Sequence, residues 1–306
     1  MSSNKSLHPV VPYLRLARPA NVVTAMADVL AGIAISGLMD ATLLTSDTLS
    51  GEITTLLKLV VITSFLYAAG VIFNDVFDYK TDLTERPERP LPSGEASLDK
   101  SIITASILYF IALLLSWTIG WQTLLCAAII TALSFTYNST TKNIAAAGPV
   151  NMGLCRGFNL LLGMSSTEIN LFPGAIVFLL PVIYIASITL ISQEEVKALH
   201  FWKLKISLLL YSSVLLLILS LSIFTSSVNI CFIFCWLFFG YSIITSLLVA
   251  IKEPSAETIR KAVKSGVINL ILLDATLASG NNVVLAVIIL LLLPVSRLLA
   301  KKFAVT

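Results

Sequence analysis

The stretch that decides how this chain is organised is Asn74-Asp75-Val76-Phe77-Asp78-Tyr79-Lys80-Thr81-Asp82. It follows an apolar run, residues 56–73, that is long enough to cross a bilayer. On a helix, Asp75, Asp78 and Asp82 fall within an arc of about 60°, and Asn74 widens the arc to about 100°. Three carboxylates on one face repel each other unless a cation lies among them. Oxygen ligands of this type suit Mg2+, which commonly keeps coordination positions for phosphate.

The composition is that of a polytopic membrane protein. Of the 306 residues, 57% are hydrophobic and only 12% are charged, and the mean hydropathy of +0.93 is well above that of soluble globular chains. In so apolar a chain, four oxygen ligands at the end of one span favour a metal site over the alternative, a solvated acidic helix end. The four cysteines lie in apolar runs without zinc-site spacing. We expect one all-α domain over residues 1–306, embedded in a lipid bilayer and binding no nucleic acid.

Ten apolar stretches are long enough to span the bilayer, and they should be helical because closed helices satisfy their backbone in lipid. They lie at about residues 21–39, 56–74, 102–119, 121–137, 146–165, 172–191, 206–225, 229–250, 262–278 and 283–300. The stretch at 262–278 is the weakest, because Lys264 and Asp274 lie near its ends. Lys and Arg gather in alternate connections and near both chain ends, which places both termini in the cytoplasm or its equivalent and favours an even number of spans. The prediction is a polytopic transmembrane helix bundle of nine or ten spans, in a bacterial inner membrane or an organelle membrane.

Two long connections on the basic side, residues 75–101 and 192–205, are expected to form a cap of two polar loops on the cytoplasmic side of the bundle. The first continues as Arg86-Pro87-Glu88-Arg89-Pro90-Leu91-Pro92-Ser93-Gly94. Arginine presents a planar donor fork that matches phosphate, and the prolines stiffen the backbone around it. Next to an acidic metal-binding face, these arginines are expected to neutralise a bound diphosphate. Juxtamembrane anchoring is the alternative.

The combined pattern of residues 74–94 resembles the UbiA superfamily of membrane prenyltransferases, which attach an isoprenoid chain from its diphosphate to an acceptor, often an aromatic ring. The resemblance covers roughly residues 13–200. It implies that Asp75, Asp78 and Asp82 are catalytic by holding Mg2+. It also implies a prenyl diphosphate and a lipophilic or aromatic acceptor as partners.

Further positions agree with this resemblance. Asn21, in Arg18-Pro19-Ala20-Asn21, is similar to an asparagine of the family's first span, and Lys142 is similar to lysines that contact the diphosphate. An arginine at membrane depth, Arg156, should face a polar cavity or a partner such as Asp28, and a purely structural pair of the two is the alternative. The residues assigned to substrate binding are Asn21, Asn74, Arg86, Arg89, Lys142, Asn151 and Arg156.

One departure from the family pattern concerns its second acidic motif, Asp-x-x-x-Asp after the sixth span. The corresponding stretch contains Glu194 and Glu195, which point about 100° apart on a helix, so Glu195 is assigned as the one ligand of a weakened second metal position. This resembles a divergent, EboC-like branch of the superfamily. Two other functions stay open: a non-catalytic pathway protein that binds a prenyl diphosphate, and a membrane transporter, which Asp28, Arg156 and Asp274 would also suit.

Overall fold

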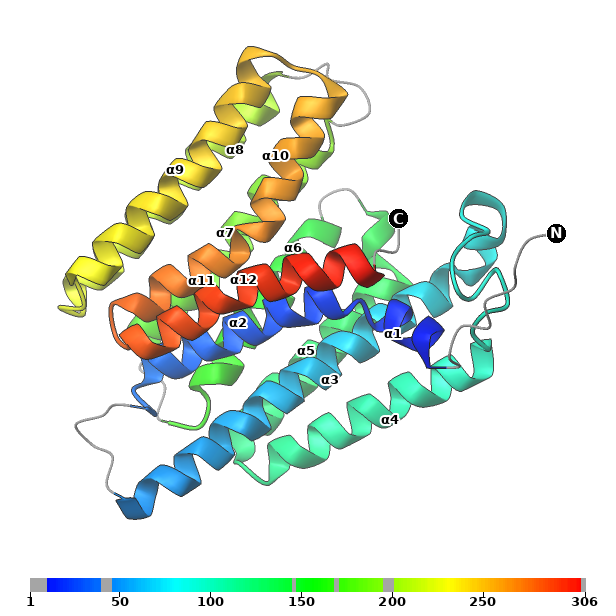
Figure 1. The fold of residues 1–306 in the computed structure, drawn as a ribbon, viewed down its shortest axis with the longest axis horizontal. Helices are drawn as coiled ribbons and strands as arrows, with labels where there is room; N and C mark the ends of the chain where they lie inside the picture. Colours follow the sequence, from blue (N-terminus) through cyan, green and yellow to red (C-terminus); the bar gives the residue numbers. More distant parts are fainter. Residues whose placement is uncertain (1–9, 40–45, 145–146, 168–170, 195–200, 304–306) are drawn as a thin grey trace.

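A computed structural model describes residues 10–39, 46–144, 147–167, 171–194 and 201–303, and the regular elements of these residues are all helical (Figure 1), as predicted. The helices are α1 (Val11–Ala17), α2 (Pro19–Ser36), α3 (Ser46–Glu85), α4 (Leu98–Trp117), α5 (Trp121–Ser139), α6 (Ala147–Met164), α7 (Leu171–Ser192), α8 (Phe201–Phe224), α9 (Ile230–Lys252), α10 (Ala256–Ile268), α11 (Leu270–Ser279) and α12 (Val283–Phe303), with a short 3₁₀ turn, η1 (Thr141–Asn143), between α5 and α6.

The predicted spans coincide with helices α2 to α12, and the weak span at 262–278 is divided between α10 and α11. Within the described residues, eight helical segments are long and apolar enough to cross a membrane, with α10 and α11 taken as one segment. Helices α5 and α6 are not among these eight. The chain is therefore a multi-pass membrane protein by its helices, and the number of crossings stays a prediction.

Helix α3 carries the acidic stretch out of the apolar bundle. It is 40 residues long, which corresponds to about 60 Å, roughly twice the hydrocarbon thickness of a bilayer. The first polar connection was expected to begin at residue 75, but α3 continues to Glu85. Arg86 precedes Pro87, and the residue before a proline is disfavoured in helical conformation, so the helix ends at Glu85 and the connection is the shorter segment 86–97.

Segment 86–97 is ordered by its own hydrogen bonds. The Ala96 amide donates to the Pro90 carbonyl at 2.9 Å, and Gly94 supplies the positive φ of 78° that the turn requires. Leu91 and Ala96 are buried, so the segment folds back and brings Arg89 against α3. The second expected loop of the cap falls largely on residues 195–200, outside the described residues, and the two-loop cap stays a prediction.

Helices α2 and α6 touch backbone to backbone in the middle of the bundle. A Cβ placed on Gly32 would lie 2.2 Å from the Leu160 carbonyl oxygen, and one on Gly163 would lie 2.2 Å from the Val29 carbonyl oxygen. No side chain fits at either position. This approach lets polar side chains one to two turns away on the two helices reach each other directly.

The weak predicted span is a broken helix. Asn269 separates α10 from α11, and its side-chain amide donates to the Ser242 hydroxyl at 2.9 Å and the Ser265 hydroxyl at 3.1 Å. After the break, α11 packs on α2 and α12, whereas α10 packs on α7, and both contact α9. Figure 1 shows α8, α9 and α10 extending together away from α2 and α12. Asp274, on α11, is fully buried.

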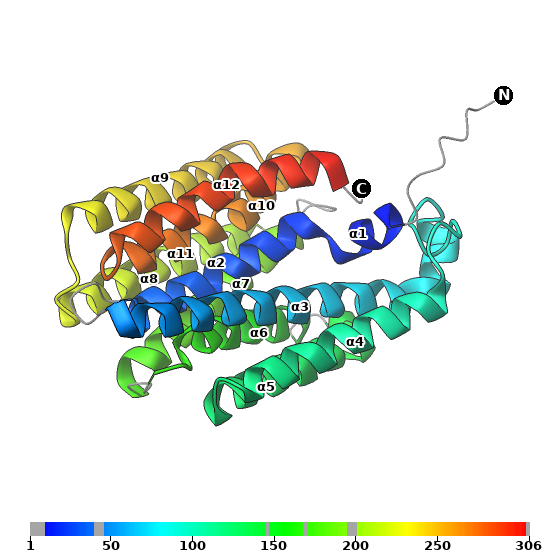
Figure 2. The ribbon, with the colours of Figure 1, turned by 60° about the horizontal axis from the view of Figure 1, so that its bottom comes forward.

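Helices α2 and α12 meet at the end of the bundle where α3 carries its carboxylates. The Ser296 hydroxyl of α12 donates to the Ala20 carbonyl of α2 at 3.0 Å, and Figure 2 shows α1 and the end of α12 at this same end. We expect reporter fusions at both termini and within residues 86–97 to report one side of the membrane, the cytoplasm-equivalent side. A C-terminal reporter on the other side would require an odd number of crossings.

Candidate active site

The three predicted carboxylates lie on one face of α3 at the open end of the bundle. Asp75 and Asp82 are buried, with 2% and 4% of their surface exposed. Asp78 is more open, and 29% of its side chain is exposed. Buried carboxylates are stable in the ionised form only when cations or hydrogen-bond donors compensate them.

Two arginines compensate the buried pair. Arg18 Nη2 lies 2.5 Å from Asp75 Oδ1, and Arg89 Nη1 lies 2.7 Å from Asp82 Oδ2 and 3.6 Å from Asp75 Oδ1. Arg89 is itself 7% exposed, so the Arg-Pro segment after α3 contributes a buried cation to the acidic face. Arg89 thus lies beside the acidic face, and its predicted contact with the diphosphate stays a prediction.

The third carboxylate is held from the other side of the bundle mouth. Lys142, on the η1 turn, forms an ion pair with Asp78 Oδ1, and the Asn74 amide donates to Asp78 Oδ2 at 3.2 Å. The Asn151 amide of α6 donates to the Thr141 hydroxyl at 3.2 Å. Asn151 therefore positions the turn that carries Lys142, and it is not among the residues that line the cavity below.

The donor chemistry at this mouth fits Mg2+. Asp75 Oδ2 is buried without a hydrogen-bond partner among the described residues, as are the Nε atoms of Arg18 and Arg89. Carboxylate oxygens are the ligands that Mg2+ prefers, and guanidinium donors match phosphate oxygens. In the described part of the chain, no three acidic, histidine or cysteine side chains converge on one point that could hold an ion. Each Asp is instead turned toward a cation, so metal binding requires these ion pairs to rearrange.

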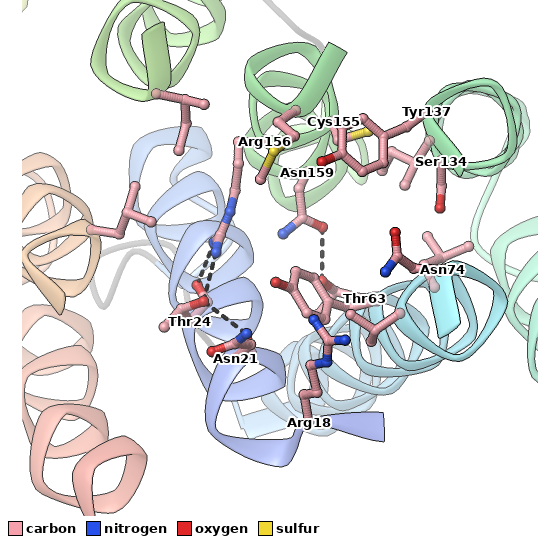
Figure 3. Close-up of a pocket in the computed structure, with 18 of the residues that line it drawn as sticks. Arg18, Asn21, Thr24, Thr63, Asn74, Ser134, Tyr137, Cys155, Arg156 and Asn159 are labelled. Atoms are coloured by element: carbon pink, nitrogen blue, oxygen red, sulfur yellow. Dashed lines mark hydrogen bonds between the residues drawn. The ribbon is translucent and has the colours of Figure 1, made fainter. Parts of the chain in front are cut away.

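A cavity of about 380 Å³ extends from the mouth into the bundle (Figure 3). Three residues predicted to bind substrate, Asn21, Asn74 and Arg156, all line it. Its remaining lining is formed by Arg18, Thr24, Thr63, Leu66, Tyr67, Gly70, Val71, Ile130, Ser134, Tyr137, Asn138, Met152, Cys155, Asn159, Ile185, Val267 and Leu270. The surface of the cavity is mostly apolar, and polar side chains are interspersed among aliphatic ones, which come from Leu66, Val71, Ile130, Ile185, Val267 and Leu270.

A buried polar network forms the floor of this cavity. Arg156 Nη1 donates to Asp28 Oδ2 at 2.8 Å, which confirms the pair suspected from the sequence. The Asn159 amide donates to the same oxygen at 2.9 Å and accepts from the Thr63 hydroxyl at 2.7 Å. The Thr24 hydroxyl accepts from Arg156 Nη2 at 2.6 Å. Figure 3 shows Thr24, Thr63, Arg156 and Asn159 meeting between α2, α3 and α6.

A match to a protein-family model decides which family the chain belongs to. The model of the UbiA prenyltransferase family matches residues 33–271, well over half of the chain. The chain belongs to the UbiA prenyltransferase family. Its placement in an EboC-like branch stays a prediction.

Relatives and solved structures of other UbiA-like proteins agree with this assignment. The digeranylgeranylglyceryl phosphate synthase of Sulfolobus acidocaldarius is 29% identical over 194 residues, which cover 62% of this chain and 64% of that protein, less than two thirds of its length. A solved structure concerning digeranylgeranylglyceryl phosphate synthase has a TM-score of 0.70 at 23% identity, covering 90% of this chain and 99% of that chain. A UbiA homolog from Archaeoglobus fulgidus bound to GPP and Mg2+ has a TM-score of 0.60 at 14% identity, covering 87% and 99%. Both structures share the fold of this chain.

Two predicted site residues of this UbiA-family chain are not placed in the site. Arg86 is exposed and makes no ion pair or side-chain hydrogen bond with any residue that the structure describes. Glu195 lies outside the described residues, so its assignment as a metal ligand stays a prediction. Its neighbour Glu194 is buried, and its Oε1 lies 2.9 Å from Lys203 Nζ.

Arg18 is the main site residue that sequence reasoning missed in this UbiA-family chain. It ends α1 and precedes Pro19 in the left-handed conformation, with φ 47° and ψ 64°. This conformation costs a residue with a side chain about 1 kcal/mol or more, and it turns the guanidinium toward Asp75. The Arg18-Pro19 pair is the sequence feature that could have indicated this role. It was not decisive, because the positive-inside rule also predicts an arginine before the first span.

Proposed function

We propose that this protein transfers an isoprenyl group from a prenyl diphosphate to a lipophilic acceptor within the membrane, with Mg2+ as cofactor. One observation carries the proposal: an acidic face, compensated by three cations, lies at the mouth of a cavity whose surface is mostly apolar. Family membership supports it, as does the UbiA homolog bound to GPP and Mg2+.

In this proposal the mouth stabilises the diphosphate as a leaving group. Asp75, Asp78 and Asp82 would hold Mg2+, which neutralises charge on the diphosphate when bound. The cationic side chains that now pair with these carboxylates would turn to the diphosphate oxygens; they are Arg18, Arg89 and Lys142. Donors aimed at charge that develops in the transition state favour ionisation of the allylic C–O bond.

The cavity walls protect the reacting carbon. Leu66, Val71 and Ile130 line one part of the cavity, and Ile185 and Leu270 line another. An aliphatic lining excludes water, which would otherwise capture the allylic cation in place of the acceptor. The diphosphate departs with the electron pair of the broken C–O bond, a hydroxyl oxygen of the acceptor forms the new bond to the allylic carbon, and the hydroxyl proton passes to the departed diphosphate.

The class of acceptor is inferred from the names of the relatives and not from the cavity. These relatives are digeranylgeranylglyceryl phosphate synthases. Removing one geranylgeranyl group from that product leaves geranylgeranylglyceryl phosphate, a lipid with a free hydroxyl. We take this phosphorylated lipid as the first acceptor to test, and a hydroxylated aromatic ring as the second.

The proposal is tested by turnover of purified protein in detergent. We expect labelled geranylgeranyl diphosphate and an acceptor to give a prenylated product, detected by mass, only when Mg2+ is present, and chelation to abolish it. Binding of the diphosphate without product, for a panel of chain lengths and acceptors, would favour a non-catalytic pathway protein. Solute uptake into proteoliposomes without product would favour a transporter.

A further inference from the structure

The floor of the cavity contains a guanidinium that is only partly used. Arg156 has five N–H donors. Both donors of Nη1 are engaged, one by the Thr24 carbonyl at 3.0 Å and one by Asp28 Oδ2 at 2.8 Å. One donor of Nη2 is engaged by the Thr24 hydroxyl at 2.6 Å. The Nε–H and the second Nη2–H donate to no residue in the described part of the chain.

The free Nε–H is open to the cavity. Arg156 lines the cavity, and its Nε, which has no partner among the described residues, is not among the buried unpaired atoms. Thr24 occupies the end of the guanidinium between Nη1 and Nη2, and Asp28 occupies the outer side of Nη1. The remaining edge, Nε–Nη2, presents two parallel donors, which is the geometry that binds two oxygens of one carboxylate or phosphate.

The edge is held rigidly. The Arg156 guanidinium lies 5.7 Å from the centre of the Tyr67 ring, on the α3 side of the cavity. Asn159 fixes the Asp28 carboxylate through a second hydrogen bond of 2.9 Å. A guanidinium fixed on three sides loses little conformational entropy when it binds a ligand.

The charges of the floor leave this edge attractive to an anion. Asp28 lies on the side of the guanidinium opposite to the free edge. Asp274, from α11, is a fully buried neighbour of Asp28. Asp28 pairs with Nη1, so no carboxylate among the described residues contacts the free Nε–Nη2 edge.

The free edge is separate from the place of the diphosphate. Thr24, which holds Arg156, lies six residues beyond Arg18 on α2, which corresponds to about 9 Å along the helix. Arg18 belongs to the mouth, where the diphosphate would bind. The distance leaves room for the reacting carbon and an acceptor between the two cationic ends of the cavity.

We propose that the Nε–Nη2 edge of Arg156 binds an oxyanion of the acceptor, either a phosphate monoester or a carboxylate. The acceptor is thereby oriented with its hydroxyl toward the mouth. The identification of this ligand as the acceptor rests on the proposed function. The binding of an oxyanion at Arg156 can be measured without turnover.

The experiment compares the dissociation constants of matched ligands for the full-length protein in detergent. The phosphate arm uses geranylgeranylglyceryl phosphate against geranylgeranylglycerol, and the carboxylate arm uses 4-hydroxybenzoate against phenol. We expect the wild-type protein to prefer the anion in one arm by about 50-fold, the effect of two charge-assisted hydrogen bonds. Arg156→Gln should lose that preference, which is about 2.3 kcal/mol. The arm that shows the preference identifies the oxyanion.

Asp28→Asn tests whether the ion pair between Asp28 and Arg156 has only a structural role. Its amide keeps the size of the side chain, and Arg156 keeps both hydrogen bonds to Thr24. We expect Asp28→Asn to retain the anion preference, and the double variant Asp28→Asn/Arg156→Gln, which removes both charges, to lose it while remaining folded. Equal affinity for both members of both ligand pairs in the wild-type protein would overturn the proposal, as would equal loss in the two single variants. Absence of turnover with intact anion preference would instead reject the proposed function.

Discussion

Asp78→Asn is expected to lower kcat/KM for prenyl transfer by about 1,000-fold, or ~4 kcal/mol of transition-state stabilisation, while the protein remains folded. The carboxylate faces the mouth beside Lys142 and Asn74, where it is proposed to hold Mg2+, and an amide is a much poorer ligand for that ion. With 29% of the Asp78 side chain exposed, little stability depends on its charge. The measurements are turnover against Mg2+ concentration and the unfolding temperature in detergent.

Two further variants give this prediction its controls. Glu85→Gln removes a carboxylate from the exposed end of the same helix, and its turnover should stay within a factor of about two. Asp75→Asn should lose activity and also stability, about 3 kcal/mol, because a 2%-exposed carboxylate then no longer compensates Arg18 and Arg89. A wild-type Mg2+ curve for Asp78→Asn would remove this residue from the metal site.

Arg18→Gln is expected to reduce kcat/KM by about 300-fold, or ~3.4 kcal/mol. Its guanidinium lies 2.5 Å from Asp75 at the top of the cavity, and the loss of one preorganised donor to a leaving group is typically of this size. The diphosphate should also bind more weakly in an equilibrium measurement with the wild-type protein as reference.

A glycine at the same position separates backbone from side-chain effects. Arg18 has a φ of 47°, a conformation that glycine adopts without strain, so Arg18→Gly should fold at least as well as Arg18→Gln and be equally inactive. Arg15→Gln is the matched control, since Arg15 forms only an exposed ion pair with Glu95 at 3.2 Å and should change turnover by less than about twofold. If Arg18→Gly is active, the arginine serves the fold and not the substrate.

Much of the architecture could be predicted because it depends on local chemistry. Apolar length predicted the helices, and the 3–4-residue spacing of Asp75, Asp78 and Asp82 predicted their common face. The Asp28–Arg156 pair was predictable because an arginine at membrane depth needs a partner, and few acidic residues were available. In each case one strong physical constraint left few alternatives.

The remaining features depend on contacts between distant segments. Thr24 and Asn159 resemble many polar residues that satisfy themselves within a membrane helix, so their part in the cavity floor carried no sequence signal. The helix breaks at Asn269, whose side chain bonds to Ser265 on the same helix and to Ser242 on α9, a contact that only the packed bundle provides. Asn151 donates to Thr141 on the turn that carries Lys142, a contact that no sequence pattern indicated, and its predicted contact with substrate stays a prediction.

The contact between Gly32 and Gly163 limits which substitutions α2 and α6 can accept. An added methyl group at either position would lie 2.2 Å from a main-chain oxygen of the opposing helix, and a main-chain atom cannot move aside as the end of a flexible side chain can. The two positions are 131 residues apart in the sequence, yet no replacement at one can compensate for a replacement at the other, because both already have the smallest side chain. In a saturation mutagenesis library selected for expression, these two codons should be the least permissive of α2 and α6, ahead of every charged residue in the cavity.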